Sequence, residues 1–278
     1  MTLGQEFESF AAAMSDDQAG LKRIITRLGK VNLGGTAIGT GIAADPRYAE
    51  AARKHLAQIT GYDIVTAPNL IEATSDVGVF LELSGALKRT ALRLSKICND
   101  LRLLASGPQA GLSEINLPPR QAGSSIMPGK VNPVIPEAMN QVAFVVAGGD
   151  ATMSMAAEAG QLQLNAFEPV MAHVLFENLN WMTAAIEMLR VNCVENITAN
   201  EEHLSSQVSS FVGVITALIP EIGYGSASRL AKEALASNAN IADLIANSGL
   251  VAPEQVKVML RPENLTSNRA SNVSATRE

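Results

Sequence analysis

The segment from residue 123 to residue 133 holds the side chains best suited to chemistry, and it reads Gly-Ser-Ser-Ile-Met-Pro-Gly-Lys-Val-Asn-Pro. It combines two hydroxyls (Ser124 and Ser125), one ammonium (Lys130) and one amide (Asn132). The ammonium and the amide can hold a carboxylate, and a hydroxyl surrounded by hydrogen-bond donors can accept a proton as an oxyanion. The segment therefore predicts a site that binds a carboxylate and moves a proton.

Two better-known motifs do not fit this segment. A phosphate-binding P-loop has four residues between its first glycine and its Gly-Lys pair, whereas five separate Gly123 from Gly129. In addition, Val131 stands where a P-loop needs Ser or Thr. A nucleophile elbow requires Gly-x-Ser-x-Gly after a strand, and no strand pattern leads into this segment. We therefore exclude both motifs.

The elements that must position the segment are long helices. Apolar residues recur at three-and-four spacing over residues 76–106 and 169–197, and a third stretch, 136–163, begins with proline. This third stretch contains an apolar run at 142–147, which predicts burial on every side. A helix of about 30 residues is about 45 Å long, more than one compact domain of this size needs. Such helices favour a bundle shared between subunits.

Three glycines, Gly148, Gly149 and Gly160, interrupt the stretch 136–163. Each costs roughly 1 kcal/mol relative to alanine inside a helix unless close backbone packing offsets the loss. The sequence leaves two alternatives open at these positions, close packing of a neighbouring backbone or a local break in the helix.

The connections between the helices carry loop signals. Residues 32–41 are dense in glycine, and Asp45 with Pro46 then predicts the start of a helix that runs through Ala57. Residues 107–133 are rich in Gly, Pro and Ser, and an irregular segment of about 25 residues is usually functional or disordered.

The expected fold class is all-α, with two domains. Residues 1–200 form a central helical bundle that carries the segment 123–133. After Asn200 the pattern changes to short stretches broken by proline and glycine, so residues 201–278 are expected to form a small helical C-terminal domain. Its last dozen residues are polar and are expected to be frayed.

The composition agrees with this fold and argues against several classes of ligand. Hydrophobic residues make up 47% of the chain and aromatic residues only 4%, which favours packed helices. A net charge of -6 argues against nucleic acid, and neither a basic leader nor a run of 18 apolar residues is present to predict secretion or a membrane span. Cys98 and Cys193 are expected to be core thiols in a reducing, cytoplasmic compartment. The three histidines, at positions 55, 173 and 203, form no cluster that predicts a metal site.

Residues 123–133 resemble the signature loop of the aspartase/fumarase superfamily at all 11 positions. Three further pieces resemble the superfamily in the same order along the chain, namely residues 2–7, 32–41 and 197–200. The resemblance covers the chain up to its polar tail. It implies the long-helix bundle of that superfamily.

Two segments separate the branches of the superfamily. Residues 133–141 and 155–165 resemble aspartases, whereas fumarases of this class carry a Pro-Thr-Gln-Cys-Glu type and a Gly-Asn-Gly-His type sequence there. The chain is therefore identified as a member of the aspartase branch. The resemblance implies reversible elimination of ammonia from L-aspartate to give fumarate, with neither a metal nor an organic cofactor.

The resemblance also implies roles for individual residues. Ser124 matches the general base that removes the Cβ proton, and Ser125 matches a donor to the β-carboxylate, where negative charge accumulates. Lys130 and Asn132 match the residues that hold the other carboxylate. Glu137 matches the acid that pairs with a histidine in the family. The simpler alternatives are that Glu137 only stabilises the start of a helix and that Lys130 is an exposed loop lysine.

The start of the chain departs from the family pattern. In the family, the piece that residues 2–7 resemble follows a Gly-Arg-Thr-His or Gly-Arg-Thr-Gln segment and well over a hundred further residues. Those residues bind substrate and pair with the acid that Glu137 matches, and the family's sites combine three subunits of a homotetramer. We therefore expect this chain to lack an N-terminal part and to be inactive alone. The alternatives are a fumarase-type lyase of class II, or a tetramerisation module without catalysis.

Overall fold

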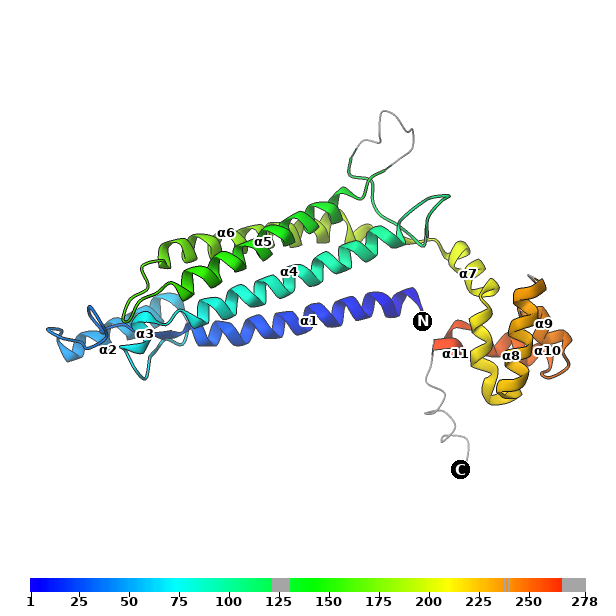
Figure 1. Cartoon of the computed structure of the whole chain (residues 1–278), viewed down its shortest axis with the longest axis horizontal. Helices are drawn as coiled ribbons and strands as arrows, with labels where there is room; N and C mark the ends of the chain where they lie inside the picture. The colour runs from blue at the N-terminus through cyan, green and yellow to red at the C-terminus, as the bar shows by residue number, and fades with distance from the viewer. Residues whose placement is uncertain (122–130, 238, 240, 267–278) are drawn as a thin grey trace, which may run out of the picture. The chain divides into compact units, whose positions relative to one another are not determined.

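Helices dominate the chain, as the sequence predicts (Figure 1). The computed structural model describes residues 1–121, 131–237, 239 and 241–266. The described chain separates into two compact units. We call residues 11–105 and 117–197 the bundle unit, and residues 1–10, 106–116 and those from 198 onward the terminal unit. The all-α fold class is confirmed, whereas the predicted domain limits, 1–200 and 201–278, stay a prediction.

Three long helices form the core of the bundle unit: α4 (Gly78–Leu104), α5 (Val134–Glu158) and α6 (Glu168–Asn192). They lie side by side, and each runs opposite to the one before it (Figure 1). Each buries apolar residues at intervals of three, four or seven, which places these side chains on one face of the helix. The buried set is Leu87, Ala91, Leu94, Cys98 and Leu101 on α4, Met139, Ala143, Val146 and Met153 on α5, and Met171, Leu175, Met182, Ala185 and Leu189 on α6.

Helices α5 and α6 each end five residues before the predicted position. At the end of α5, the Asn165 side-chain amide donates to the carbonyls of Ala156 (3.0 Å) and Ala157 (3.3 Å). At the end of α6, the Arg120 Nε donates to the carbonyl of Asn192 (2.9 Å). A side chain from the loop after α5 and one from far along the chain thus bind carbonyls that the last turns of the two helices leave free.

The apolar run at residues 142–147 is not buried on every side, so that prediction is wrong for the single chain. Ala143 and Val146 are fully buried between the helices, whereas Phe144 is 63% exposed and Val145 is 55% exposed. Helices α4 and α6 cover the side of α5 that carries Ala143 and Val146, and no described residue covers the side that carries Phe144 and Val145.

Close packing, rather than a break in the helix, explains Gly149. Helix α5 continues through this position, and a Cβ added to Gly149 would lie 2.6 Å from the Asn178 Nδ2 and 3.0 Å from the Val174 Cγ1. A Cβ on Gly148 would meet no atom within 4 Å. A larger residue at Gly149 would therefore force Asn178 or Val174 to move, and these close neighbours are side chains of α6 rather than its backbone.

A short parallel strand pair and two helices complete one end of the bundle unit. These elements are β1 (Lys30–Val31), α2 (Pro46–Thr60), β2 (Val65–Thr66) and α3 (Glu72–Ser75). The predicted helix start is confirmed, because the Asp45 side chain accepts a hydrogen bond from the Arg47 backbone N–H at 2.9 Å. In the glycine-dense segment, Gly39 has a φ of 88°, and a Cβ there would lie 2.3 Å from the Leu70 carbonyl oxygen.

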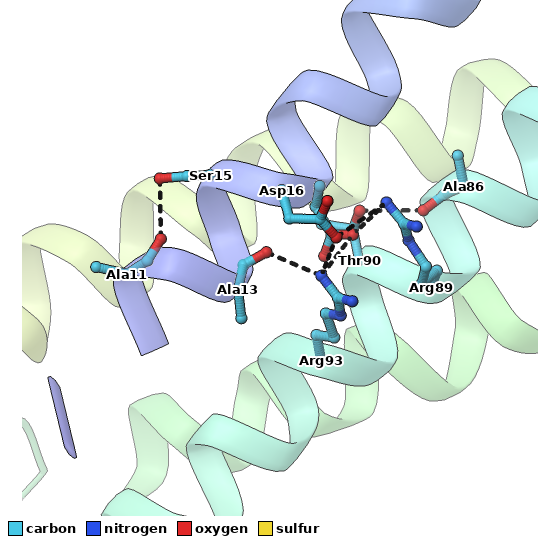
Figure 2. A network of polar contacts seen from close by, with 9 residues as sticks. Ala11, Ala13, Ser15, Asp16, Ala86, Arg89, Thr90 and Arg93 are labelled. Carbon is cyan, nitrogen blue, oxygen red and sulfur yellow. Dashed lines mark hydrogen bonds and ion pairs between the residues drawn. The ribbon is translucent and has the colours of Figure 1, made fainter. Parts of the chain in front are cut away.

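Helix α1 (Leu3–Leu28) is joined to α4 by charged side chains. The buried carboxylate of Asp17 forms an ion pair with Arg89 at 2.7 Å and accepts a hydrogen bond from Arg93 at 3.1 Å, and Arg93 also pairs with Asp16 at 3.0 Å. Figure 2 shows the two guanidinium groups reaching from α4 toward α1. The hydrogen bond from Arg93 holds the pKa of the Asp16 carboxyl below its usual range.

This α1–α4 contact depends on space as well as on charge. A Cβ added to Gly20 would lie 2.9 Å from the Arg89 Nη2, so the glycine leaves room for the guanidinium. The second oxygen of the Asp17 carboxylate, Oδ2, receives no hydrogen bond from the described residues. The contact therefore satisfies this buried carboxylate only in part.

The terminal unit contains a two-stranded pair and several short helices. Their bounds are β3 (Ile115–Asn116) antiparallel to β4 (Thr198–Ala199), α7 (Glu201–Ser210), the 3₁₀ helix η2 (Val212–Leu218), α8 (Ile219–Ser237), α9 (Ile241–Asn247), α10 (Pro253–Met259) and α11 (Pro262–Thr266). A further 3₁₀ helix, η1 (Val194–Asn196), follows α6 in the bundle unit. The short helices bury a separate apolar cluster: Ile215, Leu218, Ala227, Leu230, Ala234, Ile241, Ile245, Val251 and Val256.

No single helix within the described residues has the length and apolar composition needed to cross a bilayer. The helical stretches Glu201–Ser210 and Val212–Ser237 would reach that length and composition only as a pair, and the chain bends by 70° between them.

Candidate functional site

Two of the five predicted site residues lie in the described part of the chain. Ser124, Ser125 and Lys130 fall in residues 122–130, outside the described residues. Asn132 is exposed on the segment that enters α5, where its carbonyl accepts from the Val134 backbone N–H at 2.9 Å. Glu137 lies in the first turn of α5, half-buried. The described site is therefore the start of α5 and the side chains around it.

The two ends of the segment 122–130 lie against the same end of α6. Before the segment, Arg120 donates through Nε to the Asn192 carbonyl at 2.9 Å and through Nη2 to the Val191 carbonyl at 3.4 Å. After the segment, residues 132–136 share a small hollow with residues 117–118 and with Asn192 and Cys193. No sequence pattern points to Arg120, because its contact with α6 spans 72 positions.

Glu137 meets a cation from its own chain. Its Oε1 lies 3.7 Å from the Nη2 of Arg102, which stands in the last turn of α4. The family resemblance implies a histidine from outside this chain as the partner of Glu137, and no sequence pattern points to Arg102. A basic residue in the last turn of one helix and an acidic residue in the first turn of the next are both favoured by the helix dipoles.

The two cysteines are buried in the bundle unit, as predicted. Burial raises the pKa of the Cys98 thiol to about 12 and that of the Cys193 thiol to about 11. A thiol with such a pKa stays protonated at neutral pH and is a poor nucleophile. Neither cysteine is therefore a candidate for the chemistry, although Cys193 adjoins the start of α5.

The histidines are separated along the described chain. His55 and His173 are exposed, and the His203 Nε2 lies 2.8 Å from the Leu112 carbonyl oxygen, within the terminal unit. Within residues 1–121, 131–237 and 241–266, no group of three or more His, Cys, Asp or Glu side chains is arranged to hold a metal ion.

A large cleft opens at the other end of the bundle unit. Its volume is about 970 Å³, and it lies between the end of α1, the strand β1, residues 67–73, and the first turns of α4 and α6. Its walls include Phe80 on α4 and Leu175 on α6. Phe80 precedes Arg102 by 22 positions on the same helix, which corresponds to roughly 33 Å. The cleft is therefore remote from Glu137 and Asn132.

Family models match two parts of the chain. The model described as Lyase matches residues 1–148, and the model described as Fumarase C C-terminus matches residues 214–267. An aspartate ammonia-lyase of Pseudomonas canavaninivorans is 55% identical over 270 residues, which cover 97% of this chain and 57% of that relative. The chain thus spans little more than half the length of the curated relatives that it matches.

Solved structures are similar over almost the whole chain. The fumarate lyase:delta crystallin of Brucella melitensis bound to cobalt is 47% identical, with a TM-score of 0.92 over 96% of this chain and 58% of that one. A recombinant class II fumarase of Schistosoma mansoni is 29% identical, with a TM-score of 0.86 over 96% of this chain and 59% of that one.

Proposed function

This chain belongs to the lyase family, and we propose from this membership that it takes part in the reversible elimination of ammonia from L-aspartate to give fumarate. The observation that carries the proposal is the 55% identity to an aspartate ammonia-lyase over 97% of the chain. Because the chain spans 57% of that relative's length, the proposal assigns it one part of the active site.

In the proposed reaction, the Ser124 oxygen removes a proton from Cβ of L-aspartate. The electron pair left behind delocalises into the adjacent β-carboxylate as an aci-carboxylate, and it forms the carbon–carbon double bond when the Cα–N bond breaks and ammonia leaves. A serine hydroxyl is a poor base in water, so its oxyanion must be stabilised by hydrogen-bond donors in a site that excludes water. Ser125 donates to the β-carboxylate, where charge builds up in the transition state.

The remaining proposed residues hold the substrate and order the site. Lys130 and Asn132 bind the other carboxylate, the first as a point charge and the second as an oriented amide. Glu137 follows Asn132 by five positions, and both are anchored at the start of α5, which is a rigid support for a binding site. The proposal includes no cofactor.

We also propose that the active assembly is a homotetramer built on the long helices and located in the cytoplasm. Support for assembly comes from large apolar side chains that a single chain leaves exposed: Phe144, Val145 and Met155 on α5, and Phe176 and Trp181 on α6. Apolar side chains gathered on neighbouring exposed helices indicate an interaction surface. Copies of the same chain would cover them by extending the bundle.

Complementation tests the proposed function. The chain is mixed with a polypeptide that covers the N-terminal part of the Pseudomonas canavaninivorans relative, and the release of fumarate from L-aspartate is followed by absorbance. We expect no turnover from either polypeptide alone and aspartate turnover from the mixture. The variant Ser124→Ala should lower turnover by roughly 10³-fold, which is the usual contribution of a general base.

Two alternatives predict different results from the same mixture. The class II fumarase similarity favours malate as substrate, so malate is assayed beside aspartate, argininosuccinate and adenylosuccinate. Faster turnover of malate than of aspartate would replace the proposal with a fumarase-type activity. Assembly of the two polypeptides without turnover of any of the four would support a tetramerisation module instead. Aspartate turnover that survives Ser124→Ala would remove Ser124 from its role.

A further inference from the structure

We propose that Arg102 is a positioning residue for Glu137, so that this chain itself supplies the cation that holds the carboxylate in place. The inference rests on the proposed function, because that function is what gives Glu137 a role. It goes beyond the family resemblance, which assigns Glu137 a histidine partner and assigns Arg102 nothing.

The ion pair alone would fix Glu137 only weakly. Its shortest separation, from Arg102 Nη2 to Glu137 Oε1, is 3.7 Å, which is within the range of an ion pair and beyond that of a hydrogen bond. The side chains are 40% and 38% exposed. Exposed pairs of this kind contribute little to stability. A positioning role therefore requires that Arg102 be fixed by something other than Glu137.

Arg102 is fixed from the interior of the bundle unit. Its Nη1 donates to the side-chain oxygen of Asn140 at 3.3 Å and to that of Asn99 at 3.4 Å. Asn140 is only 5% exposed, and its Nδ2 donates to the Ser95 carbonyl at 3.0 Å and to the Ser95 Oγ at 2.8 Å. These two bonds place the Asn140 amide nitrogen toward Ser95, so its oxygen must face Arg102.

The result is a connected set of contacts from the core to the site. Ser95 and Arg102 belong to α4, whereas Asn140 and Glu137 belong to α5. Two side chains of each helix therefore alternate across the α4–α5 contact, and the buried pair orients the half-exposed pair. Packed helices with satisfied hydrogen bonds hold a side chain more precisely than a loop does.

The pairing uses one oxygen of Glu137 and leaves the other available. No described residue donates a hydrogen bond to Oε2, whereas Oε1 faces Arg102. The carboxylate is thus held on one side by α4 and can accept a donor from another polypeptide on the other side. Losing Arg102 should disorder Glu137 without removing any group that touches the substrate.

The first test measures turnover in the complemented mixture. Arg102→Gln should lower kcat by about tenfold and change KM for aspartate by less than about twofold, because a misplaced supporting group slows the chemistry more than it weakens binding. Arg102→Lys, which keeps the charge, should restore most of kcat. Arg190→Gln is the matched control, since Arg190 also stands in the last turn of a bundle helix and pairs with a glutamate, Glu187 at 2.7 Å.

The second test measures the pair without any turnover. The side-chain carboxyl of Glu137 is observed by carbon-13 NMR in the chain alone and assigned with Glu137→Gln. Its signal should shift in Arg102→Gln and stay unchanged in Arg190→Gln. An unchanged Glu137 signal in Arg102→Gln would contradict the ion pair between Arg102 and Glu137. An unchanged kcat of Arg102→Gln in an active mixture would contradict the positioning role of Arg102. If the wild-type mixture does not act on aspartate, the proposed function fails, and the NMR result alone decides the pair.

Discussion

Helix α4 contacts α5 mainly through apolar side chains, beside which Asp150 of α5 accepts from Ser84 and pairs with Lys88, whereas it contacts α1 mainly through charges. Along α5 the buried residues include Met139, Ala143 and Met153. Along α1 the buried residues are Asp17, Gly20 and Ile24, only one of which is a large apolar side chain. Apolar burial does not depend on the screening or the protonation of charged groups, but contacts between charges depend on both. The two contacts should therefore respond differently to mutation and to pH.

The largest effect is expected at the α5 contact. Met153→Ala removes a side chain that is fully buried, and it should lower the free energy of unfolding by about 3 kcal/mol, because transfer and cavity costs add. Met155→Ala is the matched control on the same helix, since Met155 is 65% exposed in the single chain and should change the stability of the dilute, monomeric chain by less than about 0.5 kcal/mol. Urea denaturation monitored by circular dichroism measures both. Equal losses of unfolding free energy in the two variants would contradict the assignment of Met153 to the buried face of α5.

A smaller effect is expected at the α1 contact. Asp17→Asn keeps the size of the side chain but removes the charge that Arg89 and Arg93 share, and it should cost about 2 kcal/mol. The two arginines are half-exposed and can be solvated when Asp17 loses its charge. The loss of unfolding free energy should therefore be smaller than for a fully buried ion pair. Denaturation at low and high salt should show a smaller difference from wild type at high salt. A loss that does not depend on salt would contradict an electrostatic contact.

The smallest effect is expected from acid at Asp16. The pKa of this carboxyl is lowered in the folded chain by the hydrogen bond from Arg93. A lowered folded-state pKa means that the stabilisation is present above the unfolded pKa, which is about 3.9, and is lost as the pH falls through the folded value. Thermal unfolding of wild type and Asp16→Asn should therefore differ at neutral pH and converge below about pH 4. A difference that persists in acid would contradict the pairing.

The sequence by itself determined the elements that depend on neighbouring residues. Periodic apolar spacing predicted α4 and α6, and an initial proline with an apolar run predicted α5. Asp45 with Pro46 predicted the start of α2, because a cap is a contact between residues only two positions apart. The motif in residues 123–133 carried the family resemblance, which the comparisons confirm, since such a match needs no structure. The proposed roles of Ser124, Ser125, Lys130, Asn132 and Glu137 come from the same resemblance and stay predictions.

Only the tertiary structure decided the contacts between distant positions. Arg102 and Glu137 are 35 positions apart, and Asp17 and Arg93 are 76 apart, so no local pattern connects either pair. The end of α6 also has a remote partner, since the Arg120 side chain binds the Asn192 carbonyl across 72 positions. The exposure of Phe144 could not be predicted from the sequence for the same reason. Apolar periodicity shows that a helix face needs cover, but packing decides which neighbour provides it.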